Sequence, residues 1–424
     1  MNTNPSGMFS VFDNGLGGLT WQQWVDKYQE KYDEFIIDGF EFAPTSLNYT
    51  FAQLIASTGA KALPAWVDPE SPGYEAALRE LSGATGNIPT AKRYYRYNRT
   101  IINEQLQLIQ RYGNVALTPD MEEIFMGLND EGTDGLIQMF YNGLTHIRNQ
   151  VVSKGKFSLT SINNPRGLQG IDIDFGIAAD HYDTLTGTAV WWTDDTHATE
   201  GKNSDPIKYM KDRVRFIRRQ KHFAGGLKME VSKDLWDDLL LHSAVRKTLG
   251  IYFYPTTTDA QTRIDAIQFL GDDALKEAIR KIIGVDEIVV RDTYAFVDAP
   301  GTDANGDPDL VTTRIDNFDP KNIAFIPTGK IGDIQGVQPL SIGYDADKVA
   351  YYNGGRLLLT QRANPKTHSI YIEGEFAQLC VPSVPQWMFI STVVGNGSSS
   401  SSSSSSEASS SSSSEAASSS SSEG

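Results

Sequence analysis

Acidic and amide side chains alternate in the turn-rich stretch TDANGDPD, and oxygen ligands of this kind suit a hard cation such as Ca²⁺. The oxygen-bearing residues are Asp303, Asn305, Asp307 and Asp309. A calcium loop of the EF-hand type needs glycine at its sixth position and a bidentate glutamate at its twelfth. Here Gly306 stands fourth and no such glutamate follows. The pattern therefore favours a polar turn between two strands.

Imidazole and carboxylate groups come together a second time, where His181, Asp183, Asp195 and His197 could surround a metal ion. Their spacing matches no pair of ligands on one helix face, so ordinary surface or core residues are the better interpretation. The six histidines are scattered, and no serine or cysteine stands in a nucleophile elbow. We therefore expect no catalytic residues, no metal and no cofactor.

Three pairs of adjacent carboxylates could in principle flank a scissile bond, as in glycoside hydrolases. They are Glu122–Glu123, Asp194–Asp195 and Asp237–Asp238. Neighbours on a helix point about 100° apart, so these pairs are better interpreted as solvated helix faces. Trp191 and Trp192 could form a sugar-binding platform, but a pair in the core is equally compatible.

Basic side chains are concentrated in a single stretch, residues 208–221. It contains Lys208, Lys211, Arg213, Arg215, Arg218, Arg219 and Lys221 against one acid, Asp212. Such a cluster indicates either nucleic-acid binding or an interface with acidic patches of a neighbouring identical subunit. The formal net charge of the chain is −16, which favours the interface.

Composition excludes several classes of protein. A hydrophobic fraction of 40% is enough for a sizeable core. Cys380 is the only cysteine, which rules out an intramolecular disulfide and zinc sites built on several thiolates. No stretch approaches the roughly 18 apolar residues of a membrane helix. The first residues lack the pattern of a secretory signal, so we expect the protein to be made in a cytoplasm.

Helix signals are strongest in the middle of the chain. An apolar stripe at spacings of three and four predicts a long amphipathic helix up to Lys154, with Gly155 as its stop. The stripe consists of Leu136, Phe140, Leu144, Ile147 and Val151. Asp205 and Pro206 predict the start of a second helix, and Ser232 the cap of a third, followed by a short turn that Gly250 closes. The stretch IDIDFG and the region after residue 286 are rich in strand patterns.

Two segments of the N-terminal quarter have too little apolar surface of their own to be stable alone. A short helix is expected from Thr20, with Trp21, Trp24, Val25 and Tyr28 on one face. The glycine-rich residues 13–18 lack the features of a phosphate loop and read as part of a flexible arm. Residues 60–67 and 91–98 could pair as a long ribbon that lies on another molecule. This organisation is typical of a self-assembling subunit.

The order of these elements resembles the lambda-type major capsid proteins of tailed bacteriophages, which have the HK97 fold. The resemblance covers residues 61–394 and is carried by several stretches in order. They are GNIPTAKRYYRYN, LIQMFYNGLTHIRNQVVSKGKFSL, AVWWTDDTH, NSDPIKYMKDRVRFI, KMEVSKDLWDDLLLHSAVRKTLG, IAFIPTGKIG and the closing YYNGGRLLLTQRANPKTHSIYIEGEFAQLCVPSVPQWMFIS.

The resemblance implies an α+β, HK97-like capsid fold with a particular division of the chain. The expected parts are an N-terminal arm (1–45), a two-stranded E-loop region (46–99), a P-domain with a spine helix (100–165), an A-domain (166–335), a P-domain β return (336–394) and a disordered serine-rich tail (395–424). Some relatives are cross-linked through Lys and Asn; Lys61 and Lys92 lie in the expected E-loop, but no partner is evident.

The resemblance also implies a function. Such subunits form the pentamers and hexamers of an icosahedral phage head around double-stranded DNA, in the host cytoplasm, without binding a membrane. Expected partners are other copies of the chain, a scaffolding protein, a portal and a decoration protein. Two alternatives remain open: an encapsulin-type compartment, and a secreted protein that binds or modifies carbohydrate.

Overall fold

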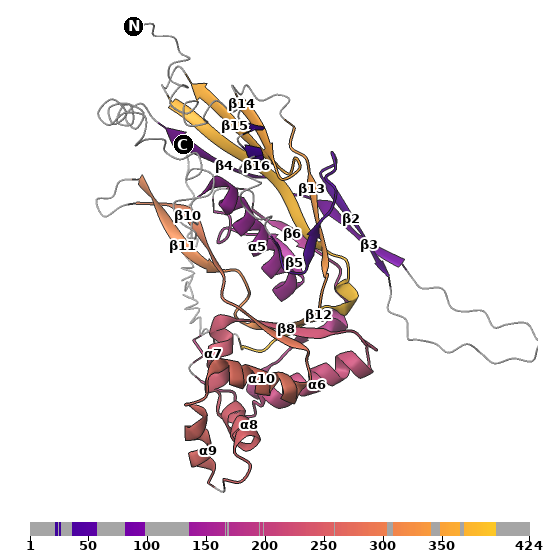
Figure 1. The fold of residues 1–424 in the computed structure, drawn as a ribbon, viewed down its shortest axis with the longest axis vertical. Helices are drawn as coiled ribbons and strands as arrows, with labels where there is room; N and C mark the ends of the chain where they lie inside the picture. The colour runs from indigo at the N-terminus through magenta and orange to yellow at the C-terminus, as the bar shows by residue number, and fades with distance from the viewer. Residues whose placement is uncertain are drawn as a thin grey trace, which may run out of the picture.

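The computed structural model describes residues 22–23, 25–26, 36–56, 81–97, 135–165, 167, 169–194, 196–197, 199–257, 259–302, 308–340, 348–364 and 369–395. It shows an elongated α+β molecule in which a long helix lies against an upper sheet and a group of shorter helices forms the lower end (Figure 1). The predicted α+β class is confirmed.

Strand β16 is the central strand of the upper sheet and pairs with three other strands. The sheet consists of β1 (Phe40–Phe42), β13 (Gly332–Val337), β16 (Ser369–Pro382), β15 (Leu357–Asn364), β14 (Lys348–Tyr352) and β4 (Ala91–Tyr97). The first part of β16 pairs antiparallel with β15 and β4, and its last six residues pair antiparallel with β13. At 14 residues, β16 joins strands from the beginning and the end of the chain.

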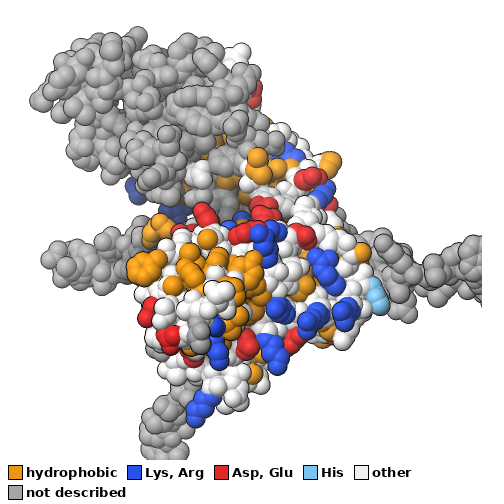
Figure 2. Space-filling model, turned by 60° about the horizontal axis from the view of Figure 1, so that its bottom comes forward, with side chains coloured by type: hydrophobic (Ala, Val, Ile, Leu, Met, Phe, Trp, Pro, Cys, Tyr) orange, Lys and Arg blue, Asp and Glu red, His pale blue; other side chains and the backbone are white. Residues whose placement is uncertain are grey.

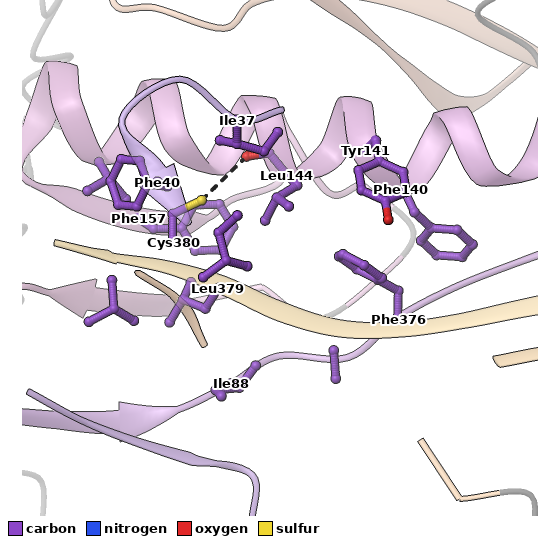
Figure 3. Packing of buried hydrophobic residues seen from close by; sticks show 14 of the residues in the cluster. Ile37, Phe40, Ile88, Phe140, Tyr141, Leu144, Phe157, Phe376, Leu379 and Cys380 are labelled. Carbon is purple, nitrogen blue, oxygen red and sulfur yellow. Dashed lines mark hydrogen bonds between the residues drawn. The ribbon is translucent and has the colours of Figure 1, made fainter. Parts of the chain in front are cut away.

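The long helix α5 (Leu136–Lys154) covers the upper sheet. Its predicted apolar stripe is buried, except that Ile147 is partly exposed. Figure 3 shows Phe140 and Tyr141 of the helix facing Phe376 of β16, and the ring centroids of Phe140 and Phe376 lie 5.6 Å apart. The helix ends as predicted, because Gly155 adopts a left-handed conformation with φ 72°.

A second sheet lies below the first core, with helices beneath it. Its strands are β7 (Tyr182–Thr184), β17 (Phe389–Thr392), β12 (Asn322–Pro327), β8 (Leu227–Ser232) and β9 (Glu287–Arg291). The helices are α6 (Pro206–Arg219), α7 (Lys233–Leu241), α8 (Ser243–Phe253), α9 (Ala260–Ile267) and α10 (Asp272–Ile283). Together they enclose a second hydrophobic core.

Strand β12 contributes to both cores. Ala324 and Ile326 lie in the upper core, whereas Ile323 and Phe325 lie in the lower one. Successive strand residues point to opposite faces, so this alternation places the lower sheet between the two cores. A strand that is buried on both faces reads as a continuous apolar run, as the sequence NIAFIP does.

Three hairpins and three short 3-10 turns complete the described fold. The hairpins are β2 (Thr50–Ala56) with β3 (Leu81–Asn87), β5 (Lys156–Leu159) with β6 (Ile171–Asp174), and β10 (Tyr294–Thr302) with β11 (Pro308–Asp316). The turns are η1 (Ala179–His181), η2 (Gly187–Ala189) and η3 (Pro385–Trp387). No helix within the described ranges is long and apolar enough to cross a bilayer.

The helix starts in the lower part agree with the sequence, but one helix end does not. The Asp205 side chain accepts a hydrogen bond from the Lys208 amide at 3.0 Å, and Ser232 accepts one from the Leu235 amide at 3.3 Å. Gly250, predicted to close a short turn, lies inside the helix α8, which continues to Phe253. Gly250 is buried where α8 packs on Arg263 of α9, so a close approach of two helices explains this glycine.

The described strands near the N-terminus form pairs that the sequence did not predict, and the predicted ribbon itself is not tested. Strand β4 pairs with β16, and β2 pairs with β3. Tyr95 of β4 packs against the upper core, which favours pairing within the sheet. The predicted partner segment 60–67 lies outside the described residues, as do residues 13–18, Lys61, the Glu122–Glu123 pair and the tail from 396 onward.

Candidate functional site: a buried ion-pair junction

Charged side chains from four separate segments meet where α5 crosses the lower sheet. They are Asp38 from the segment before β1, Arg148 on α5, Lys228 and Glu230 on β8, and Arg291 at the end of β9. We call this cluster the ion-pair junction. Arg148, Lys228 and Glu230 are buried, Arg291 is mostly buried, and the Asp38 side chain is 48% exposed.

Glu230 is the centre of the junction. Arg148 binds it in bidentate fashion, with Nη1 donating to Oε2 at 2.5 Å and Nη2 donating to Oε1 at 2.7 Å. Arg291 donates to the same two oxygens from Nε at 3.0 Å and from Nη2 at 2.8 Å. Lys228 Nζ lies 3.1 Å from Glu230 Oε1. Two guanidinium groups and one ammonium group therefore surround one buried carboxylate.

Asp38 ties the segment before β1 to the same charges. Its backbone oxygen accepts a hydrogen bond from Arg148 Nε at 3.0 Å, and its carboxylate accepts one from Lys228 Nζ at 3.1 Å. Arg291 Nη2 also donates to this carboxylate. The junction thus joins the N-terminal segment, α5 and the lower sheet.

The surrounding cations keep both carboxylates ionised. Burial by itself would raise the pKa of Glu230, but Arg148 and Arg291 hold this pKa far below its usual range. Burial also opposes ionisation of Asp38, and the hydrogen bond from Arg291 together with the charges of Arg148 and Lys228 lowers its pKa. Carboxylates held in this state cannot act as general acids near neutral pH. The arrangement suits a structural role, in which the ion pairs hold the segments of the subunit together.

The sequence contains a weak signal for the junction. Strand β8 reads LKMEVS, and all six of its residues are buried. A lysine and a glutamate two positions apart on a fully buried strand require partners, because an unpaired buried charge is very costly. The identity of those partners depends on how α5 and β9 cross the strand.

The histidines and aspartates considered as metal ligands bind other groups. His181 stacks on Phe389 at 4.3 Å between ring centroids, and Asp183 accepts a hydrogen bond from the Tyr209 hydroxyl at 2.7 Å. His197 Nδ1 lies 2.5 Å from an Asp238 carboxylate oxygen. Asp195 lies outside the described residues. Within the described ranges, no group of three or more possible ligands is arranged to hold a metal ion.

The remaining acidic candidates also contact other groups. Asp194 accepts hydrogen bonds from Thr196, and Asp237 pairs with Lys233 at 2.6 Å. Residues 303–307, which include three of the four possible calcium ligands, are not among those described; Asp309 lies in β11.

Trp191 and Trp192 are core residues. They are 0% and 5% exposed, respectively, and belong to the lower core. This burial rules out the sugar platform that was one interpretation of the pair. Cys380 is likewise buried, with its Sγ 3.9 Å from the Leu144 carbonyl oxygen (Figure 3), and burial raises the pKa of its thiol.

The basic stretch 208–221 lies on α6 and just after it, but it is not a uniform basic surface. Arg213 is buried and donates a hydrogen bond to the His181 carbonyl oxygen at 2.6 Å. Three of the basic side chains form ion pairs with nearby acids. These contacts are Arg215–Asp212, Arg218–Asp286 and Lys221–Asp180. Much of the predicted positive charge is therefore neutralised within the subunit.

Apolar side chains are exposed at the lower end of the molecule. Figure 2 shows hydrophobic groups gathered on one half of this face and Lys and Arg side chains on the other half. The large apolar residues that are exposed on α7, on α8 and in the turn after α9 are Leu241 (56%), Ile251 (51%), Tyr252 (46%) and Phe269 (89%). We call this group the lower apolar patch. Clustered apolar groups of this kind are typical of a protein–protein contact.

Comparison with known proteins identifies the class of the molecule. Residues 27–393 match a family model of phage capsid proteins, so the chain is a structural component of a virus particle. It belongs to the phage major capsid protein E family. The resemblance to tailed-phage major capsid proteins predicted from the sequence is confirmed. No curated protein matches the sequence.

Two solved structures that match the chain are a cyanophage capsid and a phage-related bacterial protein. The capsid of cyanophage P-SCSP1u has a TM-score of 0.43 and 10% identity, over 85% of this chain and 87% of that one. A phage-related protein from Bordetella bronchiseptica RB50 has a TM-score of 0.41 and 11% identity, over 89% and 98% of the two chains. Because these TM-scores lie below 0.5, the family assignment rests on the family model.

Proposed function

We propose that this protein self-assembles into the pentamers and hexamers of an icosahedral phage head that encloses double-stranded DNA. The observation that carries the proposal is the match to a major capsid protein family over residues 27–393. The net charge of −16 suits a shell that must not bind the packaged DNA tightly. Assembly takes place in the host cytoplasm, with a scaffolding protein, a portal and a decoration protein as further partners.

The division into parts predicted from the sequence is retained as a proposal with one adjustment. Helix α5 is the spine, the part around the lower core is the A-domain, and the β2–β3 hairpin forms the described base of the E-loop. Strand β13 pairs with β1 and β16, so we place the start of the P-domain return before Gly332 and not after residue 335.

The lower apolar patch is proposed as a contact between subunits of one pentamer or hexamer. Phe269 is 89% exposed, and three other apolar side chains of the same group of helices are exposed as well. Covering such side chains with a second copy lowers the free energy. The basic residues of α6 that have no acid partner among the described residues, Lys208, Lys211 and Arg219, are proposed to meet acidic groups of a neighbouring copy.

Electron microscopy of the full-length protein, produced alone and together with the product of the gene just upstream, tests the proposal. Closed shells with fivefold and sixfold clusters are the expected result. Persistent monomers under both conditions would overturn it. Nuclease treatment of particles made during phage growth separates a head from an encapsulin-type compartment, because only a head protects double-stranded DNA.

A further inference from the structure

The N-terminal residues Gln22, Gln23, Val25 and Asp26 are helical and lie at the edge of the upper sheet. Gln22 Oε1 accepts a hydrogen bond from the Tyr351 amide at 2.7 Å, and Gln22 Nε2 donates one to the Tyr351 carbonyl oxygen at 2.8 Å. One side-chain amide thus satisfies both backbone groups of a strand residue. A neighbouring β-strand would make the same two bonds.

The orientation of this amide is determined by a second contact. Gln22 Nε2 also donates to Asp26 Oδ1 at 2.7 Å, one helical turn further on. An ionised carboxylate only accepts hydrogen bonds, so the NH₂ group must face Asp26 and the oxygen must face the Tyr351 amide. Val25 anchors the same turn, since it is 1% exposed and belongs to the upper core.

The strand that Gln22 contacts is the last one on its side of the described upper sheet. Strand β14 pairs antiparallel with β15, with Tyr351 opposite Leu358 and Val349 opposite Thr360. In an antiparallel ladder, every second residue directs its N–H and C=O away from the partner strand. Tyr351 directs these groups toward Gln22, so Val349 directs its own to the same side. An open edge of this kind is a template for another strand.

We propose that Gln22, held by Val25 and Asp26, is a latch that closes the β14 edge against pairing with a strand from a second copy. In the free subunit, Gln22 occupies the ladder position at Tyr351 that such a strand would use. The latch would restrict association to the contacts that build the shell. The inference rests on the proposed function only where the formation of shells is measured.

Hydrogen exchange followed by mass spectrometry tests the contact itself. The variant Gln22→Glu places a carboxylate oxygen against the Tyr351 carbonyl and the Asp26 carboxylate, where the wild type has a donor. Hydrogen exchange in a peptide that contains residues 348–352 is expected to become about tenfold faster, because the Tyr351 N–H no longer has a well-placed acceptor. Gln23→Glu, the same change at an exposed neighbour, is the control and should exchange like the wild type. Equal exchange in the two variants would overturn the latch.

A proline substitution tests what the latch excludes. Gln22→Glu is expected to convert much of the protein into irregular aggregates that sediment, whereas Gln23→Glu stays soluble. In Gln22→Glu/Val349→Pro, the proline removes an outward N–H and blocks an incoming strand, so solubility should return. Faster exchange without aggregation, or aggregation that the proline does not relieve, would overturn the edge-closing role. A wild type that never forms shells would contradict the proposed function but leave the exchange result standing.

Discussion

Arg148 of α5 and Glu230 of β8 form a fully buried, bidentate ion pair, with nitrogen–oxygen distances of 2.5 and 2.7 Å. The two residues are 82 positions apart and belong to the two halves of the molecule, the upper sheet with its helix and the lower sheet with its helices. The pair therefore fixes how these halves meet. In a shell built from many copies, the angle between the two halves of a subunit affects how each copy meets its neighbours.

Removal of the central carboxylate should destabilise the fold strongly. In Glu230→Gln, three cations remain at the junction, and among the described residues Asp38 is the only carboxylate left to them. Breaking one side of a buried ion pair costs about 3–5 kcal/mol. Urea denaturation of the unassembled full-length chain at neutral pH measures this loss. Glu287→Gln, at an exposed position of β9, is the matched control and should change the free energy of unfolding by less than about 0.5 kcal/mol.

The same two variants should differ in their response to acid. The pKa of Glu230 is lower in the folded protein than its ordinary value of 4.5, so the unfolded chain binds this proton more readily. The stabilising contribution is complete above pH 4.5 and is lost as the pH falls toward the folded pKa. Between pH 5 and 3, the free energy of unfolding should fall less steeply in Glu230→Gln than in Glu287→Gln. Parallel curves would contradict the ionised state of Glu230.

A glycine on β16 makes room for α5. A Cβ at Gly374 would lie 2.5 Å from Phe140 Cε2. We expect Gly374→Ala to reduce the free energy of unfolding by about 1–3 kcal/mol, because the buried ring has to move. In a Phe140→Leu background the same substitution should cost less, as a double-mutant cycle would measure. Gly271→Ala, where a Cβ meets nothing within 4 Å, provides the control.

Charge on the lower apolar patch should impair assembly without unfolding the subunit. Phe269 is 89% exposed, so Phe269→Asp is expected to change the free energy of unfolding by less than about 0.5 kcal/mol. Sedimentation should show at least a severalfold drop in the yield of shells. The control is Ile162→Asp, a similarly exposed apolar residue between β5 and β6. If Phe269→Asp forms shells with wild-type yield, the patch is not a contact between subunits.

Structural features that depend on residues close together in the chain could be predicted from the sequence. The stripe of α5, the glycine that ends it and the Asp205 cap each involve positions within a few residues of one another. Their physical causes are the period of the helix, the left-handed conformation of Gly155 and the free amides of a helix start. The resemblance to capsid proteins rested on the order of such stretches, and it led to the family that the comparison confirms.

The sequence by itself determined the α+β class, the position of α5, the starts of α6 and α7, and the family. Only the tertiary structure decided that β4 pairs with β16, that Gly250 lies within α8 and that Glu230 meets Arg148 and Arg291. These relationships join residues far apart in the chain. They depend on which apolar faces are buried together, because the buried faces fix the crossing of strands and helices, and a buried charge then has to find its partners at that crossing.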